Sequence, residues 1–109
     1  MKSVTGDEML GSLAALANPI RLRIVAALTG QQKFVSQLAR ELRISRPLLY
    51  LHLQRLEAAG LVTGHLELSS DGKAMKYFEV MPFEILLNPE AIAQATQTLT
   101  DTKTEKAEE

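Results

Sequence analysis

The sequence contains no cysteine and no tryptophan, and little in it suits catalysis. Without cysteine the chain has no disulfide, no thiolate metal ligand and no thiol nucleophile. It has only two histidines and shows no glycine-rich phosphate loop, nucleophile elbow or paired-carboxylate pattern. No apolar run approaches the roughly 20 residues that span a bilayer, and the N-terminal stretch lacks the apolar core of an export signal. We therefore predict a protein that is not an enzyme, has no membrane segment and stays in the cytoplasm.

The length and composition fit one folded domain. The chain has 109 residues, and domains typically have about 100–150. Hydrophobic residues make up 46% and charged residues 23%, a balance that supports a core and excludes a disordered chain. We predict a single domain over residues 1–100, followed by a polar tail at residues 101–109 that frays.

The net charge is only −1, but the charges are unevenly distributed. Residues 19–56 contain seven cations and one anion, whereas residues 57–109 contain four lysines and ten acids. A basic middle between acidic ends is typical of a surface that binds a polyanion, although solvated helix faces alone also produce this pattern. The charge distribution therefore favours a nucleic-acid partner despite the nearly neutral total.

Apolar spacing and cap residues predict four helices in the first 60 residues. Asn18 followed by Pro19 is typical of a helix start, and Ser45 with Pro47 in the next turn is another. Leu49, Leu53 and Leu56 then repeat at helical spacing on one inward face. The expected elements are a helix at 7–17, a helix from Pro19 to Gly30, a short extended piece at 33–35, a helix at 36–42 and a helix at 45–59.

The second half of the chain predicts a hairpin and a last helix. Residues 61–68 and 74–80 are rich in strand-forming residues and flank a turn cluster that contains Asp71 and Gly72, so they predict a two-stranded antiparallel ribbon. Asn88 and Pro89 repeat the cap-and-proline start, which predicts a helix from there to about residue 100.

Three stretches resemble one known family in their order and spacing. They are LANPIRLRI at 16–24, VSQLAREL at 35–42 and ISRPLLYLHLQRLEAAGLV at 44–62. The turn Asp71-Gly72-Lys73 and the aromatic pair Tyr77 and Phe78 extend the similarity, which covers roughly residues 8–80. Together these segments resemble the ArsR-type winged-helix transcription regulators. The resemblance implies a mainly α fold with a small β wing, a winged helix-turn-helix (α+β) with N- and C-terminal helices for dimerisation.

The resemblance also implies a surface that binds double-stranded DNA. The helix at 45–59 would enter the major groove, and the wing at 66–76 would reach the backbone or the minor groove. The candidate DNA-binding residues are Gln37, Arg40, Arg43, Ser45, Arg46, Leu48, Tyr50, Leu51, Gln54, Arg55, Lys73 and Lys76. Arg46 is the candidate for base readout, with a phosphate contact as its alternative, and Ser45 is more naturally a helix cap than a DNA ligand.

Two features depart from the family pattern. Leu48, Tyr50 and Leu51 stand on the recognition helix where small polar residues are common, so they either touch thymine methyl groups or bury against another protein. Arg43 occupies a turn position that glycine often takes, which would cost up to about 1 kcal/mol if its φ is positive.

The sequence predicts no metal site and no other cofactor. Metal sensing in this family needs clustered cysteine, histidine or carboxylate ligands in the helix at 36–42 or in the last helix, and neither helix has cysteine or histidine. His52 is expected to be a packing or hydrogen-bonding residue of its helix. His65, alone on its strand, is expected to be a surface residue.

Apolar stripes outside the three-helix core predict a homodimer. The helices at about 7–17 and 89–100 carry more aliphatic residues than a small monomer can cover, which favours burial between two copies of the chain. The alternative to a dimer is that the two helices pack on each other within one chain. The candidate interface residues are Met9, Leu10, Leu13, Leu16, Ile92, Ala95 and Leu99. We predict a homodimeric transcriptional regulator of the repressor type. The rival hypothesis is a winged helix that binds another protein without specific DNA readout.

Overall fold

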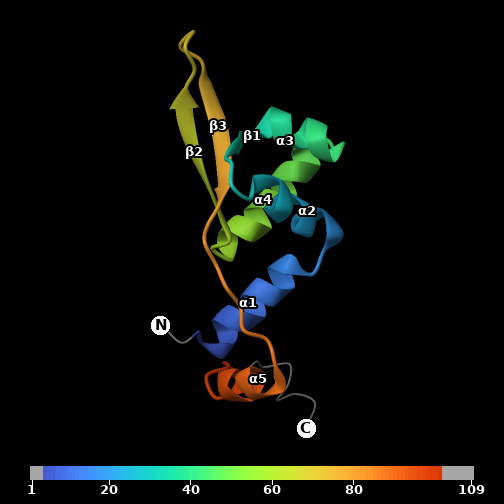
Figure 1. The fold of residues 1–109 in the computed structure, drawn as a ribbon, viewed down its shortest axis with the longest axis vertical. Coiled ribbons are helices and arrows are strands. Elements are labelled where there is room, and N and C mark those ends of the chain that lie inside the picture. The colour runs from blue at the N-terminus through green and yellow to red at the C-terminus, as the bar shows by residue number, and fades with distance from the viewer. Residues whose placement is uncertain (1–3, 102–109) are drawn as a thin grey trace. The chain divides into compact units, whose positions relative to one another are not determined.

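The computed structural model describes residues 4–101, so most of the tail predicted at 101–109 lies outside the described residues. The elements follow one another as shown in Figure 1. They are α1 (Gly6–Leu16), α2 (Pro19–Leu28), β1 (Lys33–Phe34), α3 (Val35–Leu42), α4 (Arg46–Ala58), β2 (Val62–Leu68), β3 (Ala74–Val80) and α5 (Pro89–Thr96). The described residues form two compact units, residues 12–83 and residues 4–11 with 84–101.

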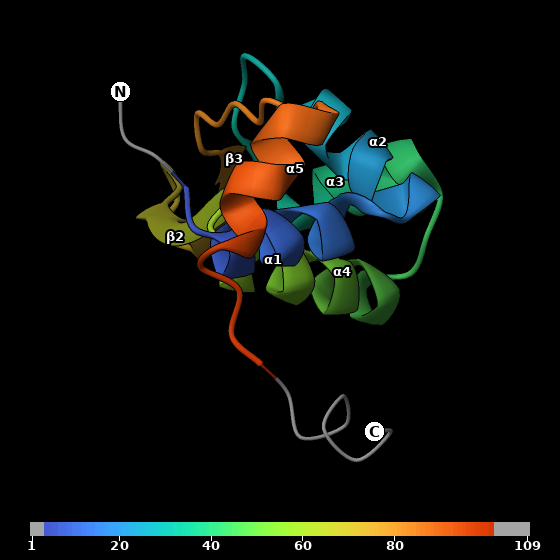
Figure 2. The same cartoon turned by 90° about the horizontal axis from the view of Figure 1, so that it is seen from below.

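The unit of residues 12–83 holds the hydrophobic core. Leu49, Leu53 and Leu56 of α4 are fully buried, as their spacing predicts. They belong to one cluster with residues of α2, α3 and the sheet, among them Ile24 and Phe78. The hairpin of β2 and β3 lies to one side of α2, α3 and α4 in both views (Figure 1, Figure 2). The predicted winged helix-turn-helix fold is therefore confirmed.

Helix starts follow the predicted cap residues. The Asn18 side chain accepts hydrogen bonds from the backbone N–H groups of Ile20 and Arg21, at 2.8 and 3.2 Å. The Asn88 side chain accepts one from Ala91 N–H at 2.7 Å. A proline follows each cap, where its missing N–H costs no helical hydrogen bond.

The predicted antiparallel ribbon is confirmed, because β2 pairs with β3 over its whole length. The extended piece predicted at 33–35 adds a third strand that was not expected to pair, which gives the strand order β1-β3-β2. The extended piece before α3 pairs antiparallel with β3, with Phe34 opposite Tyr77. Their rings meet edge to face at 5.7 Å between centroids. This cross-strand aromatic contact explains why two residues suffice to anchor the third strand at the base of the wing.

The smaller unit joins the start of α1 to α5. Gly6 N–H donates to Thr98 Oγ1 at 2.7 Å, and Thr100 N–H donates to the Asp7 carboxylate at 3.0 Å. A Cβ on Gly6 would collide with the backbone carbonyl of Ala95 and would lie 2.8 Å from Leu99 Cγ, so this approach requires glycine. The last helix ends at Thr96, earlier than the predicted residue 100, because residues 97–99 continue as tight turns.

No single helix within residues 4–101 is long and apolar enough to cross a membrane, and α1 with α2 meets that description only as a bent pair.

Candidate nucleic-acid interface

The turn between α3 and α4 sets the geometry of the helix-turn-helix. Arg43 N–H donates to the carbonyl of Arg40, and Ile44 N–H donates to the carbonyl of Ala39 at 3.1 Å. This pair of bonds is the Schellman pattern, which needs a left-handed residue between helix and loop. Arg43 takes that conformation at φ 59°, and no other residue besides glycine has a positive φ within residues 4–101. The predicted backbone strain is therefore present, at about 1 kcal/mol.

The exposed face of α4 lies opposite its core leucines. His52 joins Leu49, Leu53 and Leu56 on the buried side. Because a helix turns about 100° per residue, the direction facing away from them runs through Pro47, Leu51, Gln54 and Ala58. Tyr50 is exposed beside this line, and the side chain of Leu51 itself keeps 50% of its surface exposed.

Four arginines surround this helix and are free to bind anions. Arg40, Arg43, Arg46 and Arg55 are exposed, and their side chains make no ion pair or hydrogen bond with any part of the chain that the structure describes. Lys33 differs, since its Nζ lies 2.7 Å from Glu41 Oε1, which neutralises much of its charge. We call Arg40, Arg43, Arg46 and Arg55 the cationic corner: the first three lie at the end of α3 and the start of α4, and Arg55 lies in the last turn of α4.

Of the predicted polar residues, Ser45 has a structural role of its own. Ser45 Oγ accepts a hydrogen bond from Leu48 N–H at 3.3 Å and so caps α4, as its position predicts. Gln37 lies half-buried on α3. Leu48 is exposed on the edge of the recognition helix, so the apolar residues seen in the sequence do reach the surface.

His52 is a buried packing residue, as predicted. Its Nδ1 lies 3.4 Å from the guanidinium of Arg21, whose Nε donates to the carbonyl of Ala15 at 2.7 Å. Burial lowers the pKa of His52, and the positive charges of Arg21 and Arg55 lower it further. The imidazole therefore remains neutral at physiological pH and ties α4 to α2.

The tip of the wing presents one lysine and two leucines. Lys73 is exposed beside the turn, whereas Lys76 is half-buried with its Nζ 5.6 Å from the centroid of the Phe78 ring. Leu66 and Leu68 keep 67% and 76% of their surface exposed. These two leucines were not among the predicted site residues, although the alternation of β2 places them on the same face as buried Val62.

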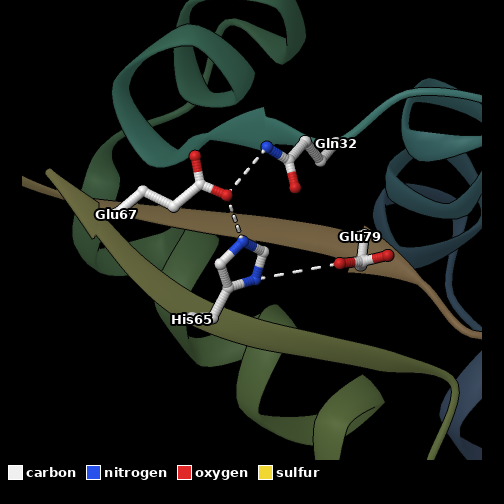
Figure 3. A network of polar contacts seen from close by, with 4 residues as sticks. All are labelled: Gln32, His65, Glu67 and Glu79. Carbon is white, nitrogen blue, oxygen red and sulfur yellow. Dashed lines mark hydrogen bonds and ion pairs between the residues drawn. The ribbon is translucent and has the colours of Figure 1, made fainter. Parts of the chain in front are cut away.

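A polar network crosses the other face of the wing (Figure 3). His65 Nε2 lies 2.7 Å from Glu67 Oε2 and its Nδ1 lies 3.8 Å from Glu79, while Gln32 Nε2 donates to Glu67 at 3.1 Å. The hydrogen bond from His65, then that from Gln32, lowers the pKa of Glu67. His65 is therefore partly exposed, as expected of a surface residue, and it also contacts two carboxylates that its position on the strand did not predict. No group within residues 4–101 has the arrangement of a three-ligand metal site.

The predicted dimer residues differ in their exposure. Leu10, Ile92 and Leu99 are exposed, Leu13 and Leu16 are half-buried, and Met9 and Ala95 are buried within the single chain. Leu16 packs against the core of residues 12–83. Of the predicted interface residues, Leu10, Ile92 and Leu99 are thus the ones left exposed for a partner.

Comparison with known proteins agrees with this architecture. A family model described as a helix-turn-helix domain matches residues 16–65. The HTH-type transcriptional regulator MJ0229 of Methanocaldococcus jannaschii is 40% identical over 78 residues, which cover 72% of this chain and 81% of that protein. The transcriptional repressor SmtB of Mycobacterium tuberculosis is 46% identical over 52 residues, which cover 48% of this chain and 38% of the repressor.

Solved structures share the fold. The transcriptional regulator HlyU of Vibrio vulnificus is 28% identical with a TM-score of 0.56, and the match covers 81% of this chain and 80% of HlyU. The homodimeric winged helix-turn-helix domain of Mb0332 from Mycobacterium bovis, a possible ArsR-family regulator, is 24% identical with a TM-score of 0.62, over 81% of this chain and 70% of that one. With its fold, its exposed arginines and these relatives, the chain belongs to the ArsR-type winged helix-turn-helix transcriptional regulators, which are DNA-binding proteins and not enzymes.

Proposed function

We propose that the chain acts in the cytoplasm as a homodimeric repressor that prefers particular duplex sequences, with α4 in the major groove and the wing at residues 66–76 on the backbone or in the minor groove. The observation that carries this proposal is the cationic corner, whose four guanidinium groups have no partner within residues 4–101. Unpaired cations around a helix about 10–12 Å wide suit the phosphates that flank a major groove.

The arginines divide between positioning and readout. Arg40 lies in the last turn of α3, and Arg43 lies in the turn that follows it. At these positions a guanidinium would contact phosphates, and such a contact carries no sequence information. Arg46 opens α4, the end of a recognition helix that approaches base edges, and it can bind O6 and N7 of guanine together. Gln54 projects farther along the same exposed face and suits adenine or a phosphate.

The dimer proposal rests on apolar surface at the smaller unit. Leu10 keeps 59% of its surface exposed, and Ile92, Leu99, Leu86 and Leu87 are exposed as well. Apolar side chains gathered at one unit of a small chain are typical of a covered interface. Two-fold symmetry would present two copies of α4 about 34 Å apart, which matches successive major grooves of a palindrome.

Duplex binding is tested by its dependence on salt. A dimer that neutralises six to ten phosphates predicts a slope of log affinity against log salt of about −5 to −9. Fluorescence anisotropy with a labelled duplex from about 50 to 300 mM salt measures this slope. Absence of binding at the lowest salt would refute the proposal and favour the rival, a protein-interaction module that uses exposed Leu48, Tyr50 and Leu51.

Assembly is tested separately by sedimentation equilibrium. The wild-type chain should sediment at twice its 12.0 kDa mass. Leu10→Glu should shift it toward monomer, because a carboxylate would have to be buried in the interface. Leu22→Glu is the matched control, since Leu22 on α2 is 54% exposed and lies outside the smaller unit. Equal effects of the two variants would contradict the assigned interface.

A further inference from the structure

We propose that the exposed apolar strip of α4, formed by Pro47, Tyr50, Leu51 and Ala58, reads the methyl groups of thymine, so that the preferred duplex carries thymines where α4 enters the groove. This inference rests on the proposed DNA binding and adds the chemistry that selects the sequence. It makes Leu51, the most exposed large apolar side chain of the strip, the main specificity residue beside Arg46.

The strip lies where base edges would be met. The buried side of α4 is fixed by Leu49, Leu53 and Leu56, which have no exposed surface. The opposite direction, about half a helical turn away, passes between Pro47 and Ala58, with Gln54 close to it on one side and Leu51 equally close on the other. If α4 lies in the major groove with its leucine side toward the protein, the side chains of the strip reach deepest into the groove.

Few hydrogen-bonding groups compete for that position. Gln54 is the one side chain of the outward line that both donates and accepts hydrogen bonds, and Arg46 lies to one side of it by about a quarter turn. Pro47 has no N–H, and the N–H of Leu48 is taken by the Ser45 side chain. Apart from the Gln54 amide and the Tyr50 hydroxyl, the outward face of α4 is thus formed by the carbon atoms of Pro47, Tyr50, Leu51 and Ala58.

Only one group on the base edges of the major groove is apolar, the C5 methyl of thymine. Hydrocarbon brought against the polar edges of guanine, cytosine or adenine would leave those edges without partners, which is unfavourable. The same hydrocarbon against a thymine methyl removes apolar surface from water on both sides. The chemistry of the strip therefore matches thymine and disfavours the other bases at the contacted positions.

The charges around the strip favour DNA over a protein as the occupant. Arg46 and Arg55 flank it on the same helix, and Arg40 and Arg43 precede it, all exposed and without partners within residues 4–101. An occupant must therefore be strongly anionic around a central apolar contact. A duplex meets both requirements, because its phosphates line the groove that holds the thymine methyls.

Replacement of thymine by deoxyuridine tests the inference, because it removes the methyl and keeps the base pairing. A preferred duplex is first obtained by selection from random oligonucleotides. Uracil is then placed at the thymines protected by the protein, or, as a control, at thymines outside the protected segment. We expect about a three- to fivefold loss of affinity for each contacted methyl, from about 0.8 kcal/mol per buried carbon group, and no loss for the control duplex.

Protein variants assign the effect to the strip. Leu51→Ala should bind the thymine and uracil duplexes with nearly equal affinity, because the side chain that covers the methyl is gone. Leu22→Ala, at a leucine of similar exposure on α2, should keep the full difference. Leu51 is half exposed, so its truncation leaves the core intact, and circular dichroism checks this.

The outcomes separate the two proposals. Sequence-selective binding with equal affinity for thymine and uracil duplexes would overturn the thymine inference and leave DNA binding intact. A preferred sequence without thymine under α4 would do the same. Absence of duplex binding at low salt would overturn both, and a thymine preference unchanged in Leu51→Ala would remove Leu51 from the inference.

Discussion

The ends of α3 and α4 are built with the same hydrogen-bond pattern but with different residues in the left-handed position. At the end of α4, Gly60 N–H donates to Glu57 and Leu61 N–H donates to Leu56, with Gly60 at φ 76°. At the end of α3 the same bonds surround Arg43 at φ 59°. The end of α4 has glycine, which adopts the left-handed conformation without strain, whereas the end of α3 has an arginine, which adopts it with strain.

This difference agrees with the proposal that the turn at Arg43 lies at the DNA-binding surface, whereas the turn at Gly60 is structural. Gly60 leads from α4 into the wing, where the His65 ring lies 2.7 Å from the Glu67 carboxylate and 3.8 Å from that of Glu79. Arg43 leads into the recognition helix, where the arginines remain unpaired within residues 4–101. Strain that persists at a surface turn and places a charge there is typical of a functional site.

The largest expected effect comes from the removal of charge at the cationic corner. Arg40→Ala combined with Arg43→Ala should lower duplex affinity about a hundredfold or more near 100 mM salt, because a dimer would lose four phosphate contacts. The matched pair on the wing, Lys73→Ala with Lys76→Ala, should cost less, since Lys76 already rests on the Phe78 ring. Anisotropy titrations compare the two variants, and a larger loss from the wing pair would reverse the roles assigned to the two regions.

Within the corner, Arg46 and Arg43 should differ in what they read. Arg46→Ala should weaken binding to the preferred duplex by about fivefold to a hundredfold and binding to a random duplex much less, as loss of a bidentate base contact predicts. Arg43→Ala should weaken both duplexes alike. Competition titrations with the two duplexes measure the ratio, and a uniform loss for Arg46→Ala would reduce Arg46 to a phosphate contact.

A smaller effect exchanges the residues of the two corners. Arg43→Gly should raise the free energy of unfolding by about 0.5–1 kcal/mol, because glycine adopts the left-handed conformation without strain, and it should weaken DNA binding as Arg43→Ala does. Gly60→Ala should lower the free energy of unfolding by about 1 kcal/mol, although nothing would contact the added methyl. Urea denaturation measures both. A loss of stability in Arg43→Gly would show that the arginine side chain supports the fold.

The smallest expected effect is the pH dependence of the free energy of unfolding that His52 of α4 produces. The pKa of His52 lies below its value in the unfolded chain because of burial and of the charges of Arg21 and Arg55. The unfolded chain therefore binds more protons as the pH falls through about 6.5, so stability is full above that pH and declines below it, by at most about 1.4 kcal/mol per pH unit. Denaturation curves from pH 7.5 to 5.5 should show this decline. His52→Gln should lose it, and His65→Gln should retain it.

The sequence predicted those parts of the fold that depend on neighbouring residues. Helix starts at Asn18 and Asn88 were predictable because a cap acts on the N–H groups two or three residues ahead. The inward leucines of α4 were predictable from helical spacing. The outward direction of Leu51 followed from the same spacing by subtraction.

Features that join distant residues were missed. The third strand has two residues, too few for an alternating pattern, and exists because Phe34 meets Tyr77 across the sheet. The bridge from His65 to Glu79 depends on hairpin register, and the pair of Lys33 with Glu41 depends on how β1 leads into α3. None of these contacts has a signature in local sequence, since each is set by tertiary packing.

Gly6 has a consequence for how this regulator can be dissected. A Cβ atom at this position would clash with Ala95 and Leu99, so even the methyl group of alanine should force α5 away from the first turn of α1. All the arginines of the cationic corner belong to residues 12–83 and do not share that contact. If the smaller unit forms the proposed dimer interface, Gly6→Ala should therefore weaken self-association and leave the cationic corner of each chain unchanged.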